Sequence, residues 1–174
     1  MLPFATVDLA ALLGLVALLI AAAVSDTRRL VVPNRYCLSI ALLYAVHVLA
    51  ARGTVDWRGG LTVGAASLAV GFVLFLLRLF GGGDAKLFAA TSLWAGPALL
   101  PELVFGTAVA GAVLAFAYLM QRRVRAVAAP AAADAAAAPQ ASPEPDRRWQ
   151  RTLPYGVAIA AGGVEIAVML FVGR

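Results

Sequence analysis

Residues 61–84, LTVGAASLAVGFVLFLLRLFGGGD, join an apolar run to three glycines and an acid. The run Leu61–Phe80 has the length of about 20 residues that a helix needs to span the hydrocarbon core of a bilayer. Gly81-Gly82-Gly83-Asp84 follows it directly and fits the pattern Gly-x-Gly-Asp. Because a carboxyl group beside hydrocarbon is costly to keep, Asp84 is a candidate functional residue.

The rest of the chain is also strongly apolar. Of its 174 residues, 63% are hydrophobic and 13% are charged, and the mean hydropathy is +0.90. A soluble domain carries about 25% charged residues, so most of this chain is expected to lie in a membrane. The apolar segments are Phe4–Val24, Tyr36–Ala51, Leu61–Phe80, Ala85–Leu100, Glu102–Met120 and Pro154–Val172. Since no alternating barrel pattern is visible, the sequence predicts an all-α integral membrane protein with a six-helix transmembrane bundle. Pro97 and Pro101 are expected to bracket a tight turn between the fourth and fifth helices.

The basic residues predict how this bundle is oriented. If the N-terminus lies outside, the outer side holds Arg52, Arg58 and Arg174, and the other eleven of the 14 Lys and Arg residues lie inside. This asymmetry has the sense of the positive-inside rule. Both termini are therefore expected outside.

Residues 121–152 differ from the helices in composition. Ala126–Pro145 consists mainly of Ala and Pro and lacks the large apolar residues that a core needs. We expect a disordered cytoplasmic linker there. This divides the chain into helices 1–5 over residues 1–120, the linker over 121–152 and helix 6 over 153–174.

The composition also argues against other classes of protein. The net charge of +5 and pI near 10.1 do not indicate nucleic-acid binding, because the basic residues sit at the ends of apolar segments. Cys37 is the one cysteine of the chain. Neither an intrachain disulfide nor a Cys-x-x-Cys metal site can form, and no metal or cofactor is expected.

A second acid, Asp26, lies at the same predicted depth as Asp84. The orientation places Asp26 at the inner end of the first helix and Asp84 at the inner end of the third or the start of the fourth. Two carboxyls held close together cannot both ionise, so they can share one proton. Such a pair can hydrolyse a peptide bond, with one carboxyl acting as base on a water and the other donating to the scissile carbonyl. Gly81, Gly82 and Gly83 would let an extended substrate backbone approach closely.

Each acid also has a plain structural interpretation. Asp84 fits the N-cap of a helix that begins at Ala85, and Asp26 fits a surface ion pair with Arg28 or Arg29. Glu165, in the middle of the last helix, is expected to be a structural glutamate or to share a proton with His47 or a helix hydroxyl. These interpretations stay open at the level of the sequence.

Three motifs, taken in order, resemble the type IV prepilin peptidases, in particular the short type of the Tad/Flp pili. They are Asp26 with Val32-Pro33-Asn34, Gly81-x-Gly83-Asp84 with Ala85-Lys86, and Leu153-Pro154-Tyr155-Gly156. The resemblance covers residues 5–120 and 152–172. It implies an aspartic endopeptidase of the bacterial inner membrane that cleaves the basic leader of prepilins at the cytoplasmic face.

The resemblance also implies roles for residues. Asp26 and Asp84 would form the catalytic pair, and the partner would be a prepilin with a basic leader and a transmembrane helix. Five further residues occupy motif positions without an assigned role: Pro33, Asn34, Lys86, Pro154 and Tyr155. Lys86 lies about 200° round the helix from Asp84, so we expect it to contact headgroups or a loop rather than that acid.

Two departures and two rival interpretations accompany the resemblance. Long family members carry paired Cys-x-x-Cys motifs in an N-terminal segment and methylate the new N-terminus, whereas Cys37 stands alone here. This argues against methyltransferase activity. The Ala/Pro-rich linker is the second departure.

Presenilin-like proteases are one rival interpretation, since they share the Gly-x-Gly-Asp pattern. However, their partner acid stands in a Tyr-Asp pair, and they have more membrane spans than this chain is predicted to have. From another class, a small transporter or assembly subunit would use Asp26 and Asp84 as a proton relay.

Overall fold

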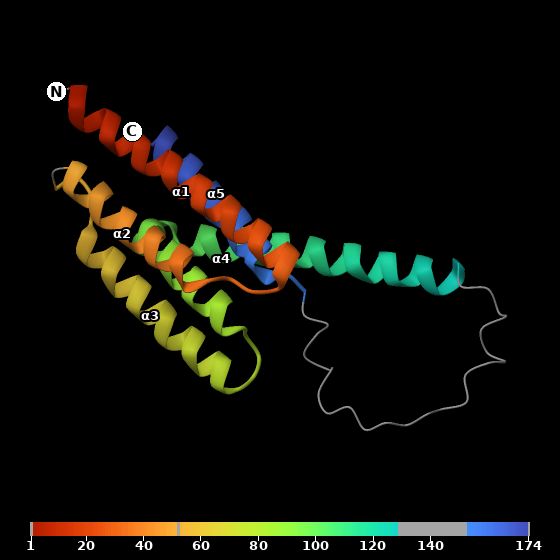
Figure 1. The fold of residues 1–174 in the computed structure, drawn as a ribbon. Coiled ribbons are helices and arrows are strands. Elements are labelled where there is room, and N and C mark those ends of the chain that lie inside the picture. The colour runs from red at the N-terminus through yellow and green to blue at the C-terminus, as the bar shows by residue number, and fades with distance from the viewer. Residues whose placement is uncertain (1, 52, 129–152, 174) are drawn as a thin grey trace.

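The computed structural model describes residues 2–51, 53–128 and 153–173. This part of the chain contains helices and turns but no strand (Figure 1). The helices are α1 (Leu2–Arg29), α2 (Asn34–Ala50), α3 (Trp57–Leu76), α4 (Gly82–Ala128) and α5 (Tyr155–Val172). The prediction of an all-α protein is therefore confirmed. Four of these helices are long and apolar enough to cross a membrane, whereas α2 is shorter, with 17 residues.

Local chemistry sets where three of the helices begin. Pro33 and Pro154 occupy the N-cap positions of α2 and α5. A backbone N–H at the start of a helix has no partner within the helix, so proline, which lacks an N–H, costs no hydrogen bond there. Asp56 caps α3, because its carboxylate accepts a hydrogen bond of 3.0 Å from the Gly59 N–H. Capping by Asp56 starts α3 at Trp57, four residues before the start that apolarity alone predicted.

One long helix, α4, covers the fourth and fifth predicted helices. Its apolar stretch has 40 residues, which as a straight helix would extend about 60 Å, about twice the thickness of the hydrocarbon core. The break comes at Gly96, with φ 58° and ψ −170°, a conformation that is open mainly to glycine. The chain turns back on itself within α4 in Figure 1.

The prediction of a turn between the two prolines is therefore wrong, since the chain turns at Gly96 instead. Pro97 and Pro101 both lie in helical residues after the break. Pro97 follows Gly96 directly and so stands at a helix start, where proline is tolerated. The count of six separate helices is not confirmed, since the described residues form five.

The helices pack as pairs with small residues at the contacts. α1 and α5 lie side by side, and α3 runs along the first part of α4 (Figure 1). In α5, Gly162 lies against Leu103 and Thr107 of α4, and Gly163 lies against Leu19 of α1. Glycine at such positions lets helix backbones approach closely, as membrane helices require.

Large apolar side chains cover the outside of this bundle. Leu49 is 77% exposed and Phe105 is 69% exposed. Such exposure is unfavourable in water, but lipid tails solvate these side chains well. The surface therefore agrees with a multi-pass membrane protein.

A polar and aromatic cluster joins α1, α2 and α4 at the end of the bundle where α2 ends. The His47 ring stacks on Trp94 with centroids 4.9 Å apart, and its Nδ1 contacts the Asp8 carboxylate. The Trp94 indole N–H donates to the Ile40 carbonyl at 3.1 Å. The suggestion that His47 partners Glu165 is not supported, since the Glu165 carboxylate lies beside Gly106 of α4 instead.

The predicted linker lies largely outside the described residues. α4 continues to Ala128, beyond the predicted helix end at Met120. Residues 129–152 are not described, so the disorder of the linker stays a prediction.

Candidate active site

Both acids singled out in the sequence line one cavity at the end of the bundle where α1 ends and α4 begins. The cavity has a volume of about 270 Å³. Its lining comprises Asp26, Leu30, Val31, Val32, Asn34, Gly81, Gly82, Gly83, Asp84 and Leu153. Asp26 belongs to the last turn of α1 and Asp84 to the first turn of α4, and the two carboxyls interact electrostatically. The fold therefore brings together two groups that are 58 positions apart in the sequence.

Asp26 is buried, with 5% of its surface exposed. Its Oδ2 accepts a hydrogen bond of 2.8 Å from the backbone N–H of Gly156, at the start of α5. Arg28 and Arg29 are exposed, and no ion pair joins either of them to Asp26 within the described part of the chain. The interpretation of Asp26 as a partner of these arginines is therefore wrong, because the last turn of α1 directs its carboxyl into the bundle.

Asp84 is half-buried and lies inside the helix rather than at its cap. α4 begins at Gly82, and the Gly81 carbonyl already accepts from the Ala85 N–H at 3.0 Å. The N-cap interpretation of Asp84 fails because the glycines themselves form the first turn. A carboxylate in the first turn still interacts favourably with the helix dipole.

The three glycines pack closely against other parts of the site. A methyl group on Gly81 would lie 2.6 Å from the Asp84 Oδ2, and one on Gly83 would lie 3.2 Å from the Cβ of Val32. The first of these distances is short enough that a side chain at position 81 would force the Asp84 carboxyl to move. Close packing within the chain therefore explains part of this glycine run.

The loop between α1 and α2 forms one wall of the cavity. Leu30 has a φ of 51°, a left-handed conformation that is uncommon outside glycine, and its N–H donates to the Asp26 carbonyl at 2.8 Å. The Ser25 hydroxyl donates to the Val31 carbonyl at 3.0 Å. This backbone reversal carries the chain from the end of α1 across the cavity to Pro33.

Lys86 connects two helix starts beside the cavity. Its Nζ donates to the Asn34 Oδ1 at 3.1 Å, which ties the start of α4 to the start of α2. Lys86 thus bonds to a residue other than Asp84, as expected, but this partner is the first residue of α2 rather than a loop or a headgroup. Among the motif positions without a role, Asn34 lines the cavity, whereas Pro33, Lys86, Pro154 and Tyr155 do not.

Gly156 is the site residue whose role the sequence did not disclose. It stands in the motif Leu153-Pro154-Tyr155-Gly156, which is the only sequence signal that points to it. It contributes a backbone N–H to the site, and the pattern of side chains in a sequence does not indicate where a backbone N–H will lie. A methyl group at this position would lie 2.8 Å from the Asp26 Oδ2, so any side chain there would force the Asp26 carboxyl or the start of α5 to move.

The described residues hold no group of three or more His, Cys, Asp or Glu side chains placed to bind a metal ion. The polar groups of the cavity are instead two carboxyls, one amide side chain and backbone. This set can move protons between a carboxyl, a water and a substrate.

Comparisons with known proteins place these features in context. The model of the type IV leader peptidase family matches residues 13–116, a range that includes both acids. Two curated proteins of Burkholderia pseudomallei, from strains 1026b and K96243, are each 29% identical over 168 residues and are named prepilin leader peptidase/N-methyltransferase. The alignments cover 92% of this chain and 45% of each relative, so the chain spans about half their length. No solved structure matches significantly.

Proposed function

Because this chain belongs to the type IV leader peptidase family, we propose that it is an aspartic endopeptidase that removes the basic leader of type IV, Flp-like prepilins at the cytoplasmic membrane face. The observation that carries the proposal is the shared cavity of Asp26 and Asp84. The two relatives are prepilin leader peptidases by name, which supports prepilin processing. We propose the peptidase activity alone, since two carboxyls account for hydrolysis.

In the proposed reaction the two carboxyls hold a water between them and share one proton. The ionised carboxyl takes a proton from the water, whose oxygen attacks the scissile carbonyl carbon. The protonated carboxyl donates to the carbonyl oxygen and stabilises the tetrahedral intermediate. When the C–N bond breaks, the carboxyl that took the proton from the water gives it to the nitrogen of the leaving amine. The other carboxyl takes back a proton from a hydroxyl of the tetrahedral intermediate as the new carboxyl product forms, so the pair again holds one proton.

The surroundings of Asp26 support this assignment. The hydrogen bond from Gly156 fixes the orientation of one carboxyl oxygen, which leaves the other free to face the cavity. Because Asp26 is buried, little rearrangement of solvent is needed when charge moves in the site. Gly81, Gly82 and Gly83 line the same cavity as Asp84, so in this proposal their backbone contacts the substrate on the Asp84 side.

The position of the acids favours hydrolysis over a proton relay. A relay across the membrane needs ionisable groups at several depths. Asp26 and Asp84 line one cavity at one end of the bundle. Purified protein in liposomes separates the two functions: we expect cleavage of a prepilin and no proton uptake.

We propose that the site faces the cytoplasm, with both ends of the chain outside. Five basic residues flank the cavity end of the bundle: Arg28, Arg29, Arg35, Arg78 and Lys86. The positive-inside rule then places this end in the cytoplasm. The start of α1 and the end of α5 lie toward the opposite end (Figure 1).

Cysteine labelling in intact cells tests this orientation. In a Cys37→Ala background, Thr54→Cys is expected to react with a membrane-impermeant maleimide from outside. Leu79→Cys, which is 72% exposed at the cavity end, is expected to react only after the cells are opened. The reverse pattern would place the acids outside and contradict cleavage in the cytoplasm.

A further inference from the structure

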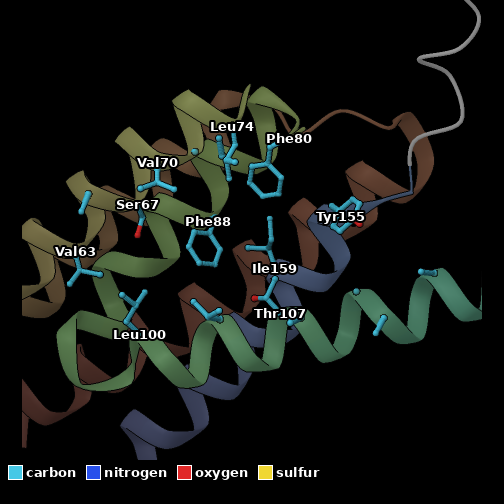
Figure 2. A pocket seen from close by; sticks show the side chains of 18 of the residues that line it. Val63, Ser67, Val70, Leu74, Phe80, Phe88, Leu100, Thr107, Tyr155 and Ile159 are labelled. Atoms are coloured by element: carbon cyan, nitrogen blue, oxygen red, sulfur yellow. The ribbon is translucent and has the colours of Figure 1, made fainter. Parts of the chain in front are cut away.

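A long apolar groove lies beside the candidate active site. We call it the α3–α5 groove; α3 and the first part of α4 form one side, and α5 and the second part of α4 form the other (Figure 2). Its volume is about 760 Å³. None of the described residues that line it carries a charge. The groove therefore suits an apolar partner rather than a polar one.

The groove runs along the bundle for most of the depth of a membrane. On α3 it extends from Thr62 to Leu74 and on α4 from Leu100 to Ala115. At about 1.5 Å per helical residue these stretches are about 18 Å and about 22 Å long. The hydrocarbon core is about 30 Å thick, so an occupant would lie alongside the helices over most of that distance.

One end of the groove meets the active-site cavity. Phe80 and Tyr155 form that end, with ring centroids 6.5 Å apart in an edge-to-face arrangement (Figure 2). Phe80 directly precedes Gly81, which lines the cavity. Tyr155 directly precedes Gly156, whose backbone N–H donates to the Asp26 carboxyl. Ala85, which also lines the groove, directly follows Asp84. At two places, Phe80–Gly81 and Asp84–Ala85, a residue that lines the groove is therefore next in sequence to a residue that lines the cavity.

Small residues line part of the groove on both α3 and α4. α3 contributes Ala66, Ser67 and Gly71 among larger residues, and the second part of α4 contributes a row of small residues after Thr107: Ala108, Gly111, Ala112 and Ala115. Residues three and four apart share one face of a helix. Small residues on such a face let another helix backbone approach closely, which gives a helix more contact than it gives a lipid tail.

We propose that the α3–α5 groove seats the apolar helix that follows the leader of the prepilin. This inference rests on the proposed function and assigns a substrate-binding surface to it. A helix in the groove would end at Phe80 and Tyr155. The extended segment before it would then pass directly to Asp26 and Asp84, so the groove would set which peptide bond reaches the carboxyls.

A substitution that fills the groove with a larger side chain tests this inference. Ala112 is exposed toward the groove, so Ala112→Phe adds bulk without disturbing the packed core. Val113→Phe is the matched control, since Val113 is 63% exposed on the same helix and does not line the groove. Each protein, in nanodiscs of one phosphatidylethanolamine and phosphatidylglycerol mixture, is given an intact prepilin and a short peptide with the leader and cleavage site only.

We expect Ala112→Phe to lower the ratio of intact-prepilin to peptide cleavage about tenfold or more relative to wild type. Val113→Phe should keep the wild-type ratio. An equal loss on both substrates, or no loss, would overturn the inference. If wild type cleaves neither substrate, the proposed function itself fails, and this inference fails with it.

A cross-linking measurement separates a helix from lipid in the groove. A benzophenone side chain is placed at position 112 or 113 of the Asp84→Asn protein, which is expected to bind prepilin without cleaving it. Position 112 is expected to cross-link to the prepilin helix and position 113 is not. Cross-links from position 112 to lipid only would show a lipid-filled groove and overturn the inference.

Discussion

Asp84→Asn protein is expected to insert into the membrane and to cleave prepilin at less than about one-hundredth of the wild-type rate, since general acid–base catalysis contributes about 10²- to 10⁴-fold. Asp26→Asn is expected to do the same. Asparagine keeps the volume and polarity of each side chain but cannot take up or release the proton that the reaction moves. Cleavage by purified protein in phospholipid vesicles measures the effect.

Asp56→Asn is the matched control for this pair. Asp56 is exposed and caps α3 through the Gly59 N–H, and asparagine caps a helix about as well as aspartate. We expect cleavage within about twofold of wild type. If Asp26→Asn or Asp84→Asn cleaves at a near-normal rate, that acid has no part in the reaction.

Gly156→Ala is expected to lower prepilin cleavage about tenfold or more although it changes no ionisable group. The added methyl would lie 2.8 Å from the Asp26 Oδ2, a contact that forces the carboxylate or the start of α5 to move. The hydrogen bond from the Gly156 N–H would then lengthen or break, and a hydrogen bond to a charged group contributes about 1.5–3 kcal/mol. The rate of prepilin cleavage, measured with the amount of inserted protein, checks this.

The same substitution at the far end of α5 separates this local effect from a general effect of replacing glycine by alanine. Gly173 is the residue that caps the end of α5, with a negative φ of −77°, and Gly173→Ala is expected to leave cleavage unchanged. Alanine favours a helix by about 1 kcal/mol over glycine, so Gly156→Ala should not unfold α5. Wild-type cleavage by Gly156→Ala would show that the contact with Asp26 does not position the carboxylate for the reaction.

Much of the site follows from local sequence patterns. The acids could be found from the sequence because a carboxyl next to an apolar run is rare enough to stand out. The direction of Lys86 followed from helical geometry alone. Helix boundaries were less well predicted: the glycine run was expected to precede a helix, but Gly82 and Gly83 begin α4.

The sequence by itself determined that the chain is helical and apolar enough to lie in a membrane, and that Asp26 and Asp84 belong to one depth, because hydropathy and charge are properties of the residues. Only the tertiary structure decided what surrounds these acids. The break at Gly96, the N–H of Gly156 beside Asp26 and the groove that ends at Phe80 and Tyr155 depend on how helices pack. Backbone groups and contacts between distant helices carry no side-chain pattern, so the sequence alone could not report them.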